Sequence, residues 1–199
     1  MNKSKKRTAK TIVFMLVFSI VVIGLYFFIK TRTHPLAVES VTSKTEVEKL
    51  LSKDITNSYP SSPREVLKLY NRITKSFYNE GLKEEQIEQL ANQMRYLYDD
   101  ELLENKSYED YLIDLKSDIS EYEIAERTII NCVVEASSSV IYWESEKENY
   151  ASIVANYFLK EGSDYSKIFE KFILRQDKDE KWKILGWDLS EKTDIETKE

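Results

Sequence analysis

The stretch FILRQDKDEKWKILGWDLS, residues 172–190, decides the fold of this chain more than any other. It starts with an apolar run, passes through the charged residues Asp177–Glu180 and ends in a second apolar run that carries two tryptophans. Two apolar runs joined by a short polar turn predict an antiparallel hairpin, with strands over Ile168–Arg175 and Trp182–Leu189. The end of the chain is therefore expected to close a β-sheet.

The second strand of this hairpin leaves open which way its apolar side chains point. If the alternation of a strand is kept, Trp182 and Ile184 share one face, and Leu185 and Trp187 share the other. The second face would then be an aromatic surface for a partner. A bulge near Gly186 would instead reverse the alternation and turn these residues into the core. Both interpretations remain open from the sequence.

Four aromatic residues are the candidates for contacts with a ligand or partner protein. Trp187 and Phe172 belong to the hairpin, Trp143 ends an upstream apolar run, and Tyr157 lies in the longest of these runs. Aromatic side chains exposed on a sheet commonly mark contact surfaces.

Upstream sequence predicts the rest of the sheet. Thr128–Glu135, Ser139–Trp143 and Tyr150–Leu159 are short and rich in β-branched or aromatic residues, and residues 161–166 (EGSDYS) are expected to form a loop. In the third of these runs the residues expected on one apolar face are Ala151, Ile153, Ala155, Tyr157 and Leu159. The result is an antiparallel sheet of four or five strands.

Three amphipathic helices precede the sheet. The first has Ser62 as N-cap and Pro63 at its first position and stops near Gly81; the second starts near Lys83, and the third opens at Ser107. Helices followed by a meandering sheet predict an α+β domain, in which three helices pack on a curved antiparallel sheet. We place this domain at residues 62–190.

The remaining segments differ in character from the domain. Residues 1–10 form a basic tail, residues 11–29 an apolar segment, and residues 30–61 a stalk or linker. The stalk is expected to contain one short helix over about residues 44–53. Residues 191–199 form a charged tail.

Residues 11–29, TIVFMLVFSIVVIGLYFFI, contain no charged residue and predict an N-terminal transmembrane helix. As a helix this segment would be roughly 28 Å long, close to the hydrocarbon thickness of a bilayer. Five basic residues precede it and only Lys30 and Arg32 follow, which predicts a cytoplasmic N-terminus and an extracytoplasmic domain. A cleaved signal peptide is the competing interpretation, although its apolar region would be shorter.

Composition excludes several classes of function. All 35 acidic residues follow position 32, whereas seven of the 29 basic residues precede position 33, so the domain would repel nucleic acid. The single cysteine, Cys132, and the single histidine, His34, exclude an internal disulfide and a Cys/His zinc set. Cys132 is expected to act as a small buried apolar residue. Nothing in the sequence fixes the oligomeric state.

Two resemblances extend this picture. The three helices, the long-stranded sheet and the final hairpin of form FxLRxDxDxKWKIxGW resemble the cystatin-like cone fold of the nuclear-transport-factor-two-like superfamily, over about residues 62–190. Residues 50–73 (LLSKDITNSYPSSPREVLKLYNRI) and 156–187 (NYFLKEGSDYSKIFEKFILRQDKDEKWKILGW) resemble small membrane-anchored bacterial proteins described only as domains of unknown function.

The cone-fold resemblance implies a pocket between the helices and the concave face of the sheet. Members of that superfamily include pocket enzymes that use Asp, His and Tyr, binders of ligands or proteins, and bitopic subunits of secretion and conjugation machines. Residues of this chain that could serve such a pocket are Tyr70, Tyr98, Tyr111 and Tyr157 as donors and Asp114 or Asp118 as a base.

We expect no catalysis, no cofactor and no metal, because the domain has no histidine and no metal-binding motif. The expected function is that of a single-pass cell-membrane protein whose exported domain binds or scaffolds a partner protein at the cell surface. The alternatives are a pocket enzyme of hydrolyase or isomerase type, a small-ligand binder in the cone cavity, and a secretion-machine subunit.

Overall fold

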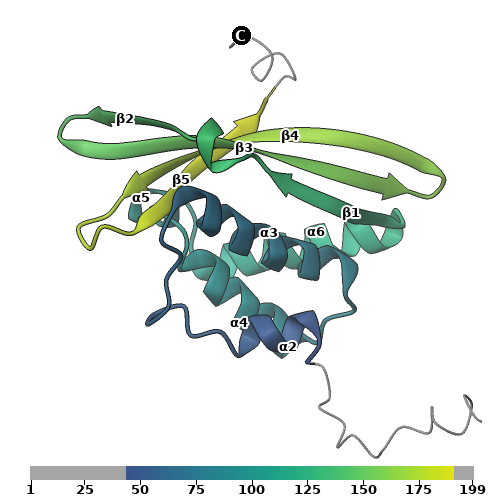
Figure 1. Cartoon of the computed structure of the whole chain (residues 1–199). Coiled ribbons are helices and arrows are strands. Elements are labelled where there is room, and N and C mark those ends of the chain that lie inside the picture. Colours follow the sequence, from purple (N-terminus) through teal and green to yellow (C-terminus); the bar gives the residue numbers. More distant parts are fainter. Residues whose placement is uncertain (1–43, 191–199) are drawn as a thin grey trace, which may run out of the picture. The chain divides into compact units, whose positions relative to one another are not determined.

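The computed structural model describes residues 44–190 and shows five helices on one antiparallel sheet within that range (Figure 1). The helices are α2 (Glu46–Leu51), α3 (Pro63–Asn79), α4 (Glu84–Arg95), α5 (Asp100–Glu104) and α6 (Tyr108–Ile124). The strands are β1 (Arg127–Val134), β2 (Ile141–Ser145), β3 (Glu148–Glu161), β4 (Asp164–Gln176) and β5 (Trp182–Leu189), and a 3-10 turn, η1 (Ser137–Ser139), separates β1 from β2.

The expected fold class is wrong as stated and is corrected in two respects. Residues 44–190 contain five helices: the three expected in the domain, α2, which forms where a short helix was expected over about residues 44–53 but packs in the core of the domain, and the short α5, which was not expected. The expected transmembrane helix at residues 11–29 lies outside the described residues, and within residues 44–190 no helix is long and apolar enough to cross a bilayer. The structure is an α+β domain with a five-stranded antiparallel sheet, and this part of the prediction agrees with it.

The long strand β3 organises the sheet, whose order is β1-β3-β4-β5. The first part of β3 pairs with β2, from Ile141 opposite Ser152, and its second part pairs with β1, from Val134 opposite Ala155. Along its other edge β3 pairs with β4 over its full length. The expected loop at 161–166 is thus mostly strand, and only the turn at Gly162 and Ser163 separates β3 from β4.

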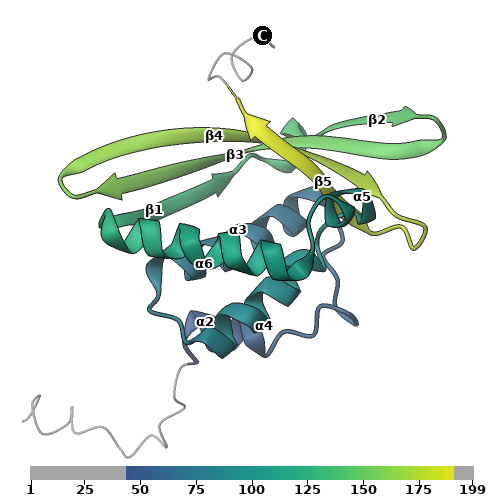
Figure 2. The same ribbon diagram turned by 180° about the vertical axis from the view of Figure 1, so that it is seen from behind.

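The helices cover one face of the sheet. α3 and α6 lie directly against it, whereas α2 and α4 lie farther from the sheet and pack beneath them (Figures 1 and 2). The face of β3 predicted to be apolar is buried beneath these helices, from Ala151 to Leu159. The alternation of a strand therefore located the core correctly here.

Helix starts follow the local sequence. The Ser62 side chain accepts a hydrogen bond from the backbone N–H of Glu65 at 3.3 Å, and Pro63 occupies the first turn, as expected. α2 begins with a capping box in which Thr45 and Glu48 exchange backbone and side-chain hydrogen bonds. Both helices therefore begin where their side chains satisfy free N–H groups.

Residues 44–61, expected to belong to a stalk, contribute to the core of the domain. Leu50 is fully buried, and Val47 and Ile55 are 5% and 6% exposed. All three belong to the same apolar cluster as the helices α3 and α4 and the sheet.

A bulge in β5 settles the direction of its side chains. Ile173 pairs with Gly186, but the adjacent pair is Leu174 with Ile184, so Leu185 is an additional residue on β5. The bulge reverses the alternation, as one of the two interpretations held. Trp187 therefore faces the helices rather than forming an outer aromatic surface.

Candidate functional site

A cavity of about 490 Å³ lies among α3, α4, α6 and β5. Its volume falls within the range of ligand pockets in proteins. The residues that line it are Tyr70, Thr74, Phe77, Tyr78, Met94, Arg95, Tyr98, Leu102, Asn105, Lys106, Tyr111, Asp114, Leu115, Ser117, Asp118 and Trp187. We call it the aromatic pocket, because six of these residues carry aromatic rings.

The back of the aromatic pocket is a cluster of rings contributed by α3, the α4–α5 connection and β5. The ring centroid of Trp187 lies 5.9 Å from that of Tyr70 and 6.1 Å from that of Tyr98. Phe172, fully buried, stacks against Trp187 at 5.8 Å and meets Tyr70 edge-on at 5.3 Å. Trp187 is nevertheless 41% exposed, so its ring also forms part of the pocket opening. This arrangement depends on the β5 bulge.

Three phenol groups in this pocket remain protonated at neutral pH. Burial is the main cause that raises the pKa of Tyr70 and Tyr98 well above the ordinary value of 10, and it raises the pKa of Tyr111 to about 12. A protonated phenol is a hydrogen-bond donor, and none of the three can act as a base near neutral pH.

Charged groups are placed at the mouth of the pocket. Lys106 forms an ion pair with Asp114, and the Arg95 guanidinium lies 5.3 Å from the centre of the Tyr111 ring. Burial, followed by the charges of nearby carboxylates, raises the pKa of Asp118 above its ordinary value. The lining thus contains two cationic and two acidic side chains around an aromatic interior.

The four residues predicted as contacts do not form one surface. Phe172 and Trp187 meet at the back of the aromatic pocket. Tyr157 is buried on β3, where its hydroxyl donates a 2.6 Å hydrogen bond to Oδ1 of Asn71. Trp143 lies on β2, stacked 5.5 Å from Tyr150 and 39% exposed. Only Trp187 combines pocket lining with exposure.

Most of the residues that the cone-fold resemblance implied for a pocket do lie together. Tyr70, Tyr98, Tyr111, Asp114 and Asp118 all line the aromatic pocket. Tyr157 is the exception: it lies on β3 and does not line the pocket, and its hydroxyl contacts Asn71 of α3.

Several pocket residues had no signal in the sequence. Asn105 and Lys106 follow α5, a helix of five residues that is too short to show an apolar period. Tyr78 lies near the end of α3, and its ring stacks on that of Tyr122 in α6 with centroids 4.0 Å apart. The sequence does not show that these two helices are neighbours, so it gave no reason to select Tyr78.

The described residues were also considered for a reactive thiol and for a group of metal ligands. Burial raises the pKa of the Cys132 thiol to about 12, so it stays protonated at neutral pH and is a poor nucleophile. Within residues 44–190 no three Cys, His, Asp or Glu side chains are grouped as metal ligands would be.

The sequence was compared with known protein families. A family model described as a domain of unknown function (DUF6715) matches residues 1–187. The chain therefore belongs to this family, as its resemblance to domains of unknown function indicated. No curated protein matches the sequence.

Proposed function

We propose that this member of the DUF6715 family binds a small, largely apolar ligand in the aromatic pocket. The observation that carries the proposal is the cavity of about 490 Å³, walled by Tyr70, Tyr98 and Trp187 beneath the sheet. Ligand pockets are typically apolar and aromatic, with a few polar groups that orient the ligand. Here the phenol hydroxyls and the charged groups of the mouth supply that polarity.

Binding without chemistry is the simplest function of this site. A general base would need a pKa matched to neutral pH and a fixed position beside the substrate. Asp118 is exposed and Asp114 is paired with Lys106, so neither carboxylate is held deep in the pocket. We therefore propose a binder rather than the hydrolyase or isomerase alternative.

The test compares two phenylalanine substitutions on α6 in a chain that begins at Lys44. Ser117 lines the pocket, whereas Ser120 is exposed on the same helix and does not. A library of aromatic and aliphatic fragments is screened by thermal denaturation. Ligands at 100 times their Kd should stabilise the wild type by about 2.7 kcal/mol. Ser120→Phe should keep this response and Ser117→Phe should lose it.

Equal stabilisation of both variants by every active fragment would place binding elsewhere. Absence of any active fragment, with both variants folded, would also count against the proposal. A fragment response that only Ser117→Phe lacks supports it.

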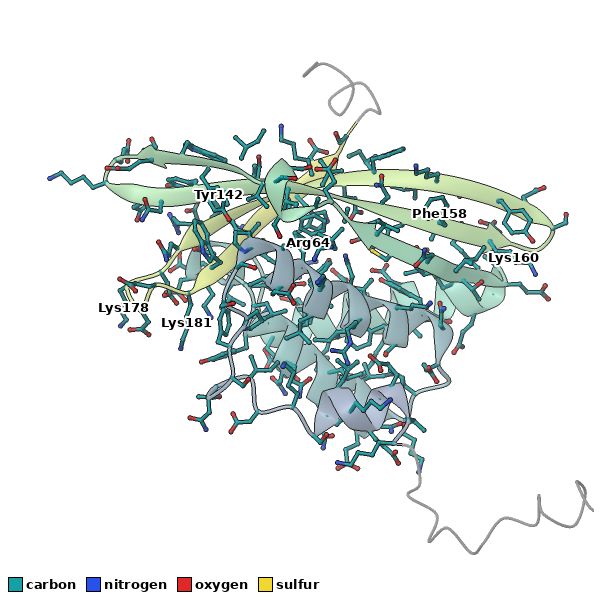
Figure 3. All side chains as sticks on the ribbon, viewed as in Figure 1. Arg64, Tyr142, Phe158, Lys160, Lys178 and Lys181 are labelled. Carbon is teal, nitrogen blue, oxygen red and sulfur yellow. The ribbon has the colours of Figure 1, made fainter. Side chains whose placement is uncertain are left out.

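A protein partner is the second proposal, and it rests on a different surface. Trp143 is 39% exposed on β2, in the β2–β3 hairpin that extends beyond the helices (Figure 3), and its ring stacks 5.5 Å from that of Tyr150. Exposed aromatic rings favour contact surfaces. A photo-crosslinking amino acid at Trp143 should trap a partner in whole cells, and one at Glu144 on the opposite strand face should not. Equal trapping at both positions would contradict this surface.

Localisation is likewise a proposal. We propose that the apolar sequence 11–29 attaches the chain to the cell membrane, with residues 1–10 in the cytoplasm and the domain outside. The support is the sequence itself: an uncharged segment with most of its flanking positive charge in front of it. Protease accessibility in spheroplasts tests it, since only an external domain would be cleaved without lysis.

A further inference from the structure

A second cavity, of about 360 Å³, lies between α3 and β1. It shares no lining residue with the aromatic pocket, because it opens on another side of α3. The residues that line it are Arg64, Lys68, Asn71, Arg72, Lys75, Asn131, Cys132, Val133 and Val134. We call it the basic cavity.

Four cationic side chains of α3 line the basic cavity, and no acidic side chain does. Arg64, Lys68, Arg72 and Lys75 are spaced four, four and three residues apart, which places them on one face of the helix. The concentration is unexpected in a chain with 35 acidic and 29 basic residues. It creates a local positive field that the rest of the domain does not share.

Two of these cations hold only surface carboxylates. Lys68 pairs with Glu65 at 2.7 Å, and Arg72 pairs with Glu46 at 2.7 Å. All four of these side chains are more than 40% exposed. Exposed pairs of this kind contribute about 0–1 kcal/mol, so a bound anion can displace or share them at little cost.

The other two cations are held by backbone carbonyl groups. Nε of Arg64 donates to the carbonyl oxygen of Glu135 at 2.6 Å, and Nζ of Lys75 donates to that of Ile130 at 2.9 Å. Figure 3 shows Arg64 between α3 and the sheet. A carbonyl orients a cation without neutralising it. Arg64 also lies 3.7 Å from the exposed carboxylate of Glu65, whereas no ion pair of Lys75 occurs within residues 44–190. The cavity therefore keeps positive charge to offer.

The side-chain amide of Asn71 is a second, independent observation that points to a ligand in the basic cavity. Its side chain lines the basic cavity and the residue is only 6% exposed. Oδ1 accepts the Tyr157 hydroxyl at 2.6 Å, and in this orientation Nδ2 does not bond to that phenol. Nδ2 then has no hydrogen-bond partner within the described part of the chain. A buried unpaired donor costs about 1–3 kcal/mol, which an acceptor in the cavity would recover.

We propose that the basic cavity binds a small organic anion through a phosphate or carboxylate group. The oxygens would accept from Nδ2 of Asn71 and from the cations of α3, with charge-assisted bonds to the arginines. The exposed Val133 and the buried Val134 add apolar lining for the rest of the ligand.

The first test uses the full chain and two probes, inorganic phosphate and citrate, each compared with sodium chloride at equal ionic strength. The variants are Lys75→Gln and Arg64→Gln, with Lys83→Gln as the control, since Lys83 is exposed and lies outside the cavity. At least one probe should bind the wild type and Lys83→Gln with the same Kd. Binding should weaken at least 10-fold in the two cavity variants.

A response to phosphate alone, or to citrate alone, identifies the group that the cavity prefers. Equal affinities in all variants would mean an adventitious ion only and would overturn the proposal, as would no binding beyond that of chloride.

A second readout is independent of any substitution. In a ¹⁵N-labelled full chain, the side-chain amide signals of Asn71 should shift when the probe binds, because Nδ2 gains an acceptor. Probe-dependent shifts confined to other asparagines would contradict the proposed contact. Ser117→Phe should bind the probe as the wild type does, so failure of the aromatic-pocket proposal would leave this result unaffected.

Discussion

Asp99 holds several parts of the domain together. The residue is 4% exposed, and its carboxylate accepts from Nε of Arg175 at 3.0 Å and from the backbone N–H of Glu101 at 3.0 Å. Its own N–H donates to the carbonyl of Ile184 on β5 at 2.9 Å. One side chain thus joins the start of α5 to β4, while its backbone joins β5.

Replacing Asp99 by alanine should lower the free energy of unfolding by about 3 kcal/mol, because Arg175 loses its buried partner and α5 loses its cap. Glu101→Ala is the control, since Glu101 is 66% exposed and 3.4 Å from the same guanidinium. It should cost less than about 1 kcal/mol. Urea denaturation measures both, and similar losses would refute this role of Asp99.

Glu170 makes the stability of the domain depend on pH. Burial raises the pKa of its carboxyl above the ordinary value of 4.5, although Tyr157 opposes this shift. Above pH 4.5 the unfolded chain has released the proton while the folded chain retains it. The free energy of unfolding therefore falls as the pH rises from 4.5 to the folded-state pKa.

Glu170→Gln removes this contribution. The variant should gain stability relative to the wild type between pH 4 and pH 7, as measured by denaturation at both values. Glu144→Gln is the control, because Glu144 is exposed on β2. The difference in stability between this variant and the wild type should be the same at pH 4 and pH 7. A constant gap between Glu170→Gln and the wild type would show that Glu170 does not titrate in this way.

At the scale of elements, the sequence predicted what periodicity can reveal. The long helices α3, α4 and α6 and all five strands carry apolar patterns of period 3.6 or 2, and each formed near its expected place. α5 is too short for a pattern. Gly186 marks the position of the β5 bulge, which adds Leu185, but a glycine in a strand does not by itself require a bulge, so the sequence offered it as one of two choices. The basic cavity was missed because its cations are far apart in sequence from β1.

Turn chemistry gives a prediction at the same scale. Gly162, in the turn between β3 and β4, has φ of +56°, a conformation that costs a side chain energy. Gly162→Ala should therefore destabilise the domain by about 1 kcal/mol. Gly186→Ala should change stability by less than about 0.5 kcal/mol. An added Cβ at Gly186 meets no atom within 4 Å, and φ there is not positive. Equal effects in thermal denaturation would contradict this account.

For the whole molecule, the limits of the folded unit follow from its core. Val47, Leu50 and Ile55 are buried in it, and each contributes about 1.5–3 kcal/mol. Together these contributions are comparable with the total stability of a domain, about 5–15 kcal/mol. A chain that begins at Lys44 should fold cooperatively, whereas one that begins at Ser62 should not. Circular dichroism during heating distinguishes them, and a cooperative transition in the shorter chain would contradict this limit.

The two cavities lie on different sides of α3, so one helix positions both proposed sites. Its aromatic side chains, such as Tyr70, face the pocket beneath β5, and its cations face β1. The fold follows from local patterns, but the sites do not, because each combines residues from elements that are distant in sequence. Ligand binding in the aromatic pocket is the function that we propose for this arrangement.

The most direct measurement is energy transfer from Trp187 to a bound probe. In a chain that begins at Lys44, Trp143→Phe and Trp182→Phe leave Trp187 as the only tryptophan. N-phenyl-1-naphthylamine, a neutral fluorescent amine, is then titrated. Saturable, one-to-one quenching of Trp187 with sensitised probe emission is expected, and Ser117→Phe should abolish both. Unquenched Trp187 emission, or quenching that survives Ser117→Phe, would contradict binding in this pocket.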